Sequence, residues 1–272
     1  MTYLGVRNGT DLPYLALWSK LDAAQRQYRE SREAPMSERK ITVAAKPEPI
    51  EVGLAKTAIL VVDMQNDFGA KGGMFDRGGI DIAPIQRVAV SVRKVLDASR
   101  EAGVPIVFLK MGYRPDLSDL GAEDAPFRAH HRGFAPGTVV QSPHGPSRLL
   151  VRDTWNTEIL PELAPKAGDV EVWKHRYSGF YETELDAVLK QKRVKWLIVT
   201  GCTTSVCVES TVRDAMFRDY FCLLLADCMA EPVGTHESSL ALMQARFAWV
   251  TESTDFLQAL QTHATAAPGP GV

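Results

Sequence analysis

Apolar residues after Thr57 occur in two alternating patterns: short continuous runs, and longer stretches with helical spacing. A continuous apolar run is typical of a strand that is buried on both faces, as in a parallel sheet. The predicted strands are 57–62, 104–109, 170–173, 196–200, 221–226 and 248–250. The predicted helices are 84–101, 182–191, 206–219, 234–246 and 254–262, and 112–150 is predicted to be irregular. Strands that alternate with helices indicate an α/β fold, with a parallel sheet covered by helices on both faces.

The two ends of the chain differ from this regular pattern. Residues 1–52 are predicted to form an N-terminal arm, with one helix at 15–32 where apolar residues recur at roughly helical spacing. Prolines after that helix predict a connector, and the arm is expected to pack on the domain or on a second subunit. The main domain is predicted to span 53–263. The tail 264–272 consists of small residues, Gly and Pro, and is expected to be disordered.

Composition and charge exclude several classes of protein. The chain has 272 residues, 45% of them hydrophobic and 24% charged, which is typical of a globular protein rather than a disordered one. Its formal net charge of −2 gives no electrostatic reason to expect binding to nucleic acid or a membrane surface. The sequence shows no secretory signal, no apolar run long enough to span a membrane and no Cys-x-x-Cys pair. We therefore expect a cytoplasmic protein with reduced cysteines, and we expect a homo-oligomer, either a dimer or a tetramer.

Chemically useful residues follow the predicted strands. Parallel sheets bind ligands beyond the carboxyl ends of their strands, so the residues directly after each apolar run are the candidates. Cys207 follows the strand 196–200 and is expected in the first turn of the next helix, which Ser205 or Thr204 would cap. In that position the helix dipole and free backbone N–H groups would favour the thiolate and could hold an oxyanion. The alternative is a buried, inert cysteine.

Two other strand ends add ionisable groups. Asp63 closes the strand 57–62 and is either a cap for the next turn or a catalytic acid or base. Lys174 closes the strand 170–173, where it either has a buried partner or extends into solvent as a surface lysine. If both residues met Cys207 at one edge of the sheet, they would supply a proton acceptor and a cation beside a nucleophile.

These residues belong to a set of motifs that resembles a known family, the isochorismatase-like cysteine hydrolase superfamily. The motifs are Asp63-Met64-Gln65-Asn66-Asp67-Phe68, Lys174, and Gly201-Cys202-Thr203-Thr204-Ser205-Val206-Cys207-Val208. The resemblance covers about 57–260, and it implies a six-stranded parallel sheet between two helix layers, a three-layer αβα fold. It also implies a catalytic triad of Asp63, Lys174 and Cys207. It further implies a cis peptide bond between Cys202 and Thr203, and an oxyanion hole made by the backbone N–H groups of Thr203 and Cys207.

Members of this superfamily differ in their chemistry. Isochorismatases resemble the chain in fold but act on a vinyl ether and need no cysteine, so Cys207 favours C–N bond hydrolysis through a thioester. Nicotinamidases have a metal site with an Asp-x-His motif after the second strand, where this chain has 109–116 without a histidine. The six histidines show no metal-ligand spacing, and we expect neither a metal nor a cofactor. His130 and His131 are interpreted as a solvated pair in a loop.

Within the superfamily, the chain most resembles ureide hydrolases. The stretches 174–180 and 207–214 resemble ureidoacrylate amidohydrolases of pyrimidine breakdown, whereas 71–73 and 114–120 resemble biuret hydrolases. We therefore predict an amidohydrolase that cleaves a C–N bond of a small ureide or carbamoyl amide through a cysteine thioester, releasing ammonia or a carbamate. A biuret-type or other N-carbamoyl hydrolase is the alternative. An isochorismatase-type ether hydrolase and a non-catalytic binding protein are two further alternatives.

Six residues are candidates for substrate binding: Gln65, Asn66, Phe68, Arg114, Arg176 and Tyr177. Gln65 and Asn66 would orient the substrate amide. Arg176 and Tyr177 would contact a substrate carboxylate or carbonyl, or else form a surface turn. Arg114 is the rival cation for the carboxylate.

Overall fold

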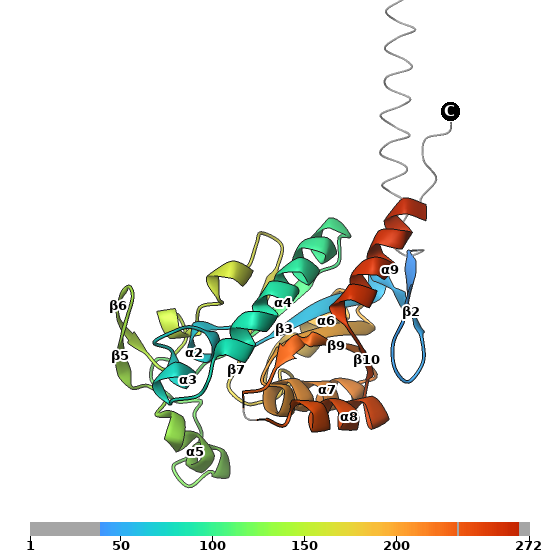
Figure 1. The fold of residues 1–272 in the computed structure, drawn as a ribbon. Coiled ribbons are helices and arrows are strands. Elements are labelled where there is room, and N and C mark those ends of the chain that lie inside the picture. The colour runs from blue at the N-terminus through green and yellow to red at the C-terminus, as the bar shows by residue number, and fades with distance from the viewer. Residues whose placement is uncertain (1–38, 233, 267–272) are drawn as a thin grey trace, which may run out of the picture.

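The computed structural model describes residues 39–232 and 234–266 and contains a central sheet of six parallel strands (Figure 1). The strands are β3 (Thr57–Val62), β4 (Ile106–Met111), β7 (Val170–Lys174), β8 (Trp196–Cys202), β9 (Phe221–Ala230) and β10 (Trp249–Thr251). They lie in the order β10-β9-β8-β3-β4-β7, and every neighbouring pair is parallel. The sheet therefore starts in its middle, extends toward β7, and resumes from β8 on the other side of β3. Open α/β sheets bind ligands at such a reversal, which here lies between β3 and β8.

Helices cover both faces of this sheet (Figure 1). The helices on one face are α4 (Ala83–Glu101) and α9 (Ser253–Ala266), and those on the other are α6 (Leu185–Gln191), α7 (Glu209–Met216) and α8 (His236–Arg246). Alternate residues of β3 supply the two cores. Ile59 and Val61 pack with α4 and α9, whereas Ala58 and Leu60 pack with the helices of the other face. This arrangement confirms the predicted three-layer αβα fold with a six-stranded parallel sheet.

Several short elements occur where the sequence pattern is irregular. The section 112–150 contains α5 (Pro126–His131) and an antiparallel hairpin of β5 (Val139–Ser142) and β6 (Gly145–Arg148). The other short helices are α2 (Asn66–Gly69), α3 (Met74–Arg77), and the 3₁₀ helices η2 (Leu54–Lys56), η3 (Arg132–Phe134), η4 (Trp155–Thr157) and η5 (Pro161–Leu163). The predicted helix 206–219 is observed as a π-helix, η6 (Thr204–Val208), followed by α7.

A hairpin near the N-terminus differs from the predicted connector. β1 (Lys40–Val43) and β2 (Ile50–Gly53) pair in antiparallel fashion, although the sequence analysis assigns nearly all of these residues to the arm 1–52. Ile41 and Val52 lie in the same hydrophobic core as α9, so the hairpin is part of the domain. Each strand has only four residues, and such a short alternation of apolar and polar positions is hard to distinguish from a connector.

Most of the remaining predictions for the two ends of the chain concern residues outside the described ranges. The predicted helix at 15–32 lies outside the described residues. The predicted tail 264–272 also lies outside them, except for its first three residues, which continue α9. Within the part of the chain that the structure describes, no helix is both long enough and apolar enough to cross a membrane.

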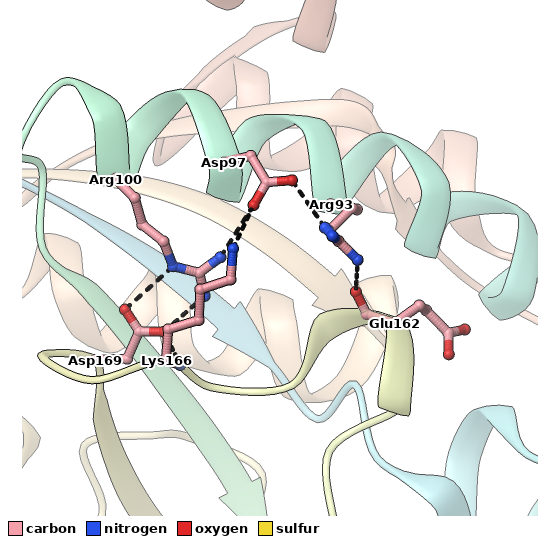
Figure 2. A network of polar contacts seen from close by, with 6 residues as sticks. All are labelled: Arg93, Asp97, Arg100, Glu162, Lys166 and Asp169. Carbon is pink, nitrogen blue, oxygen red and sulfur yellow. Dashed lines mark hydrogen bonds and ion pairs between the residues drawn. The ribbon is translucent and has the colours of Figure 1, made fainter.

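A network of charged side chains fixes the loop before β7 to α4 (Figure 2). Arg93 on α4 donates to the carbonyl oxygen of Glu162 at 2.8 Å, and Arg100 forms an ion pair with Asp169 at 2.6 Å. Asp97 lies between the two arginines, 2.8 Å from Arg93 and 3.4 Å from Arg100. Because β7 begins directly after Asp169, these contacts fix the start of that strand against the helix layer.

Candidate active site

β3 and β8 approach each other closely where the strand order reverses. Gly201 on β8 pairs with Val62 on β3, and a Cβ atom at Gly201 would collide with the carbonyl oxygen of Val62. Gly201 also has a φ of +118°, a conformation that residues with side chains rarely adopt. Glycine is therefore required here. The close approach lets the turn after β8 lie beside Asp63, the residue that follows β3.

Three buried side chains meet at this edge of the sheet: Asp63, Lys174 and Cys207. Nζ of Lys174 lies 2.7 Å from Oδ2 of Asp63 and 3.3 Å from Sγ of Cys207. The lysine reaches them from β7 across the end of β4, where it also contacts Sδ of Met111 at 3.8 Å. Asp63 and Lys174 are 0% exposed, and Cys207 is 7% exposed. The structure thus brings together three residues that the sequence analysis selected from separate strand ends.

Burial dominates the ionisation of these groups. Burial raises the pKa of Asp63, and the Lys174 ammonium offsets this only in part. Burial, followed by the nearby Asp63 carboxylate, raises the pKa of the Cys207 thiol well above its usual range. Burial disfavours the Lys174 ammonium, but Asp63 and Cys207 outweigh this effect and the pKa of the lysine is raised. Burial therefore favours the protonated thiol of Cys207, and it opposes the stabilisation of the thiolate that a helix start would give.

The turn after β8 differs in detail from the expected start of a helix. The Cys202–Thr203 peptide bond is cis, as the family resemblance implies. Cys207 lies within the π-helix η6 rather than in the first turn of an α-helix, and neither Thr204 nor Ser205 caps it. The hydroxyl groups of those two residues instead bond to side chains at the end of β9 and the start of α8. Single π-helical turns are frequent at functional sites because they shift a side chain out of the regular helical position.

A cavity of about 230 Å³ opens beside Cys207. Most of its wall is aromatic or aliphatic, and the polar side chains on it are Thr203, Cys207, Tyr177 and His131. Such a cavity excludes water and strengthens the few hydrogen bonds and charge interactions made inside it. The described residues contain no group of three His, Cys, Asp or Glu side chains that could hold a metal ion, at this cavity or elsewhere.

The predicted substrate-binding residues fall into two groups. Phe68 and Tyr177 line the cavity. Gln65 is fully buried and makes three hydrogen bonds to the backbone of β4 and η4. The Asn66 amide donates to a carbonyl oxygen of η4 at 2.7 Å. Gln65 and Asn66 therefore hold the chain around the site and do not line the cavity.

Arg114 and Arg176 line a separate, open groove of about 630 Å³. The Arg176 guanidinium donates to the carbonyl oxygens of Asp119 at 2.9 Å and His175 at 2.7 Å. It also lies over the ring of Phe127, 4.3 Å from the ring centroid. Its polar contacts are thus made with the protein backbone, and neither arginine lines the cavity.

The position of His131 shows that its interpretation as a solvated loop residue is wrong. It is the last residue of α5, is 3% exposed and lines the cavity, whereas the neighbouring His130 is exposed. α5 has only six residues within an irregular section, which is too short for a periodic pattern to reveal which side is buried. The available signal is Pro126 in its first turn, a position that proline favours.

Asp67 is a second buried group that the sequence analysis does not select. Its carboxylate accepts hydrogen bonds from the backbone N–H groups of Met74 and Leu150 and from the side-chain amide of Asn156. Met74 and Leu150 both line the cavity, so Asp67 joins two parts of its wall. Burial raises the pKa of Asp67 to about 6, although these hydrogen bonds favour the charged form.

Replacing Asp67 with asparagine is expected to destabilise the protein by about 1–3 kcal/mol. All three partners of the carboxylate are N–H donors, so the amide nitrogen of the substituted side chain would face a donor and leave it unpaired. Urea unfolding at pH 8, where Asp67 is ionised, measures the change. Asp124→Asn at an exposed position is the control and should change stability by less than about 0.5 kcal/mol. Equal stability of the two variants would contradict the bridging role.

Comparison with known proteins adds sequence relatives to this geometry. The model of the isochorismatase domain family matches residues 57–255. Ureidoacrylate amidohydrolase RutB of Serratia proteamaculans is 35% identical over 231 residues, which is 84% of this chain and 92% of that protein. The protein of the same name from Rhizobium rhizogenes is 37% identical over 218 residues, 79% of this chain and 88% of that protein.

Solved structures of other hydrolases share the fold of this chain. A cysteine hydrolase from Pseudomonas syringae pv. phaseolicola has a TM-score of 0.67 at 26% identity, covering 84% of this chain and 99% of that one. N-carbamoylsarcosine amidase from Thermoplasma acidophilum has a TM-score of 0.55 at 25% identity, with 73% and 96% covered. The fold and the relatives define a hydrolase that acts on carbon–nitrogen bonds other than peptide bonds. The chain belongs to the isochorismatase family, which confirms the resemblance.

Proposed function

We propose that this protein hydrolyses a C–N bond of a small ureide, such as ureidoacrylate, through a thioester on Cys207. The observation that supports this most directly is the Lys174 ammonium, which contacts both Asp63 at 2.7 Å and Cys207 at 3.3 Å beside the cavity. A nucleophile, a base and a cation in mutual contact supply what covalent amide hydrolysis needs. The names of the two RutB relatives support the substrate class.

The first half of the reaction transfers the carbamoyl group to sulfur. Asp63 takes the proton of the Cys207 thiol while the sulfur attacks the carbamoyl carbon and forms the C–S bond. The raised pKa of Asp63 makes it a stronger base than an exposed carboxylate. The backbone N–H groups of Thr203 and Cys207 hold the oxyanion of the tetrahedral intermediate. The C–N bond then breaks, and the leaving amine takes the proton from Asp63.

The second half of the reaction releases the carbamoyl group. Asp63 takes a proton from water, and the water oxygen attacks the thioester carbon. The C–S bond breaks, the sulfur regains a proton from Asp63, and the product leaves as a carbamate. Lys174 stays protonated throughout, because contact with Asp63 and Cys207 keeps its pKa high. It thereby balances the negative charge that moves between the carboxylate and the sulfur.

The aromatic wall of the cavity favours a small and largely planar substrate. Phe68 and Phe75 form part of its wall, with their ring centroids 5.1 Å apart in an edge-to-face arrangement. The Tyr177 hydroxyl has no hydrogen-bond partner among the described residues, and it is our candidate for contact with a substrate carboxylate or carbonyl. Arg176 lies over the ring of Phe127, which in turn stacks on the cavity residue His131.

A substrate panel read by ammonia release tests the proposed function. The panel contains ureidoacrylate, biuret, an N-carbamoyl amino acid and nicotinamide, and we expect the highest kcat/KM for ureidoacrylate. A maximum for biuret or for the carbamoyl amino acid would favour the alternative of a different ureide hydrolase. Release of ammonia from none of the four would contradict the proposal and favour a non-catalytic binding protein.

The acid limb of the pH profile is expected above pH 4. Asp63 acts in its charged form, so kcat/KM falls as the pH drops through the pKa of this carboxyl, which burial raises above the usual value. The profile of kcat/KM between pH 4 and 8 measures the effect, and circular dichroism at each pH verifies that the protein stays folded. A rate that stays constant down to pH 4 in the folded protein would contradict the role of Asp63 as the base.

We further propose that the protein works in the cytoplasm as a homo-oligomer. All four cysteines are free and buried, which suits a reducing compartment. Light scattering on the eluted protein measures the oligomeric state, and a monomer at micromolar concentration would contradict this part of the proposal.

A further inference from the structure

His131 is the polar group on the cavity wall that the proposed mechanism does not use. It ends α5, is 3% exposed and lines the same cavity as Cys207. Burial lowers the pKa of His131 to about 4, and the charges of Lys174 and Arg176 act in the same direction. The ring is therefore neutral at the pH at which most enzymes work.

One hydrogen bond determines which ring nitrogen holds the proton. Nδ1 of His131 lies 3.2 Å from the carbonyl oxygen of Phe127, one turn earlier in α5. A carbonyl oxygen can only accept a hydrogen bond, so Nδ1 is the protonated nitrogen of the neutral ring. Nε2 is then an acceptor, and it has no hydrogen-bond partner among the described residues.

Aromatic neighbours hold the ring in place. His131 stacks on Phe127 with ring centroids 3.9 Å apart and an interplanar angle of 28°. The ring centroids of Tyr177 and Phe134 lie 5.3 Å and 5.7 Å from that of His131. The Arg176 guanidinium covers the ring of Phe127, 4.3 Å from its centroid. A fixed acceptor in a mostly apolar wall costs free energy when it is unpaired, so a ligand that supplies a donor is favoured.

We propose that Nε2 of His131 accepts a hydrogen bond from an N–H group of the bound substrate, and that it thereby selects ureides with a free N–H over their N-alkylated analogues. The inference rests on the proposed function and names a specificity residue for it. Sites built to hydrogen bond a substrate group reject analogues without that group strongly, because the protein group is then left buried and unpaired. The substrate class follows from the wall itself, where a neutral acceptor suits an N–H donor better than it suits a carboxylate.

Two variants at this position separate hydrogen bonding from ring shape. His131→Phe keeps an aromatic ring and removes the acceptor, and it should lower kcat/KM for the best ureide by about ten- to a hundredfold. His131→Asn keeps an acceptor oxygen and should remain within a few-fold of the wild-type protein. His130→Phe at the adjacent exposed position is the matched control and should leave kcat/KM unchanged. Thermal unfolding of each variant verifies that it is folded.

The ratio of kcat/KM between the best ureide and its N-methylated analogue is the decisive measurement. We expect His131→Phe to bring this ratio close to one, because phenylalanine cannot accept a hydrogen bond from the N–H group of the ureide. An unchanged ratio in folded His131→Phe would overturn the inference while the proposed function still stood. A nitrogen-15 NMR spectrum that placed the proton on Nε2 would overturn it as well.

A binding measurement keeps the inference testable if the proposed function fails. If the wild-type protein hydrolysed no ureide, calorimetry with 3-ureidopropionate would compare the Cys207→Ala protein with the Cys207→Ala/His131→Phe protein. Weaker binding to the double variant by about tenfold or more would support the contact with His131. Equal affinity, or no binding to either protein, would overturn it.

Discussion

Cys207→Ala is expected to lower kcat for the best ureide by at least about 10⁴-fold while the protein stays folded. The reason is chemical: alanine cannot form the C–S bond on which both halves of the proposed reaction depend. The side chain lines the cavity and is only 7% exposed, so its truncation removes one sulfur atom from the wall and leaves the surrounding residues in place. Single-turnover assays with the purified variant measure the loss.

The matched control for this variant is a buried cysteine away from the site. Cys222 on β9 is 0% exposed, lies in the core with α8 and does not line the cavity, so Cys222→Ala should change stability more than kcat. Mass spectrometry of the wild-type protein during turnover should detect a carbamoyl group on Cys207. Retained activity in a folded Cys207→Ala protein would exclude the covalent mechanism.

The residues at strand ends could be selected from sequence because the geometry of parallel sheets is general. Continuous apolar runs mark buried strands, and the carboxyl ends of parallel strands share one edge, so Asp63 and Lys174 could be assigned to the same edge before the strand order was known. Whether they meet depends on the strand order, which the pattern does not give. The pattern of apolar runs does not predict which of these side chains are charged. A helix start favours the thiolate of Cys207, whereas burial of the side chain raises the pKa of the thiol and acts in the opposite direction.

The cavity wall could not be predicted in the same way. Its residues come from short helices and irregular segments, where no period shows which side of the chain is buried. Gln65 and Arg176 were selected as polar groups close in sequence to the catalytic candidates, yet both donate to backbone carbonyl oxygens of neighbouring segments. The histidines show no metal-ligand spacing, which leaves His131 interpreted as half of a solvated loop pair, whereas tertiary packing against Phe127 and Tyr177 buries it.

Asp63→Asn is expected to destabilise the protein by about 3–5 kcal/mol and to abolish turnover. Asparagine removes the base, which accounts for the loss of activity. It also leaves the Lys174 ammonium at 0% exposure without its carboxylate partner, and an uncompensated buried charge is more costly than a lost ion pair. Urea unfolding at pH 7 measures the stability, and the same preparation provides the assay.

The double variant Asp63→Asn/Lys174→Met separates the two effects. Methionine approximates the length of the lysine stem and has no charge, so the double variant should regain most of the stability that Asp63→Asn loses, yet stay inactive. The exposed pair Lys40–Glu51, 2.6 Å apart, is the control. A double-mutant cycle on that pair should give a coupling free energy of at most about 1 kcal/mol. Additive losses in the buried pair would show that Asp63 and Lys174 do not depend on each other. The charge balance on which the proposed mechanism relies would then be wrong, because a lysine that ionises independently of Asp63 has no reason to follow the charge moving between carboxylate and sulfur.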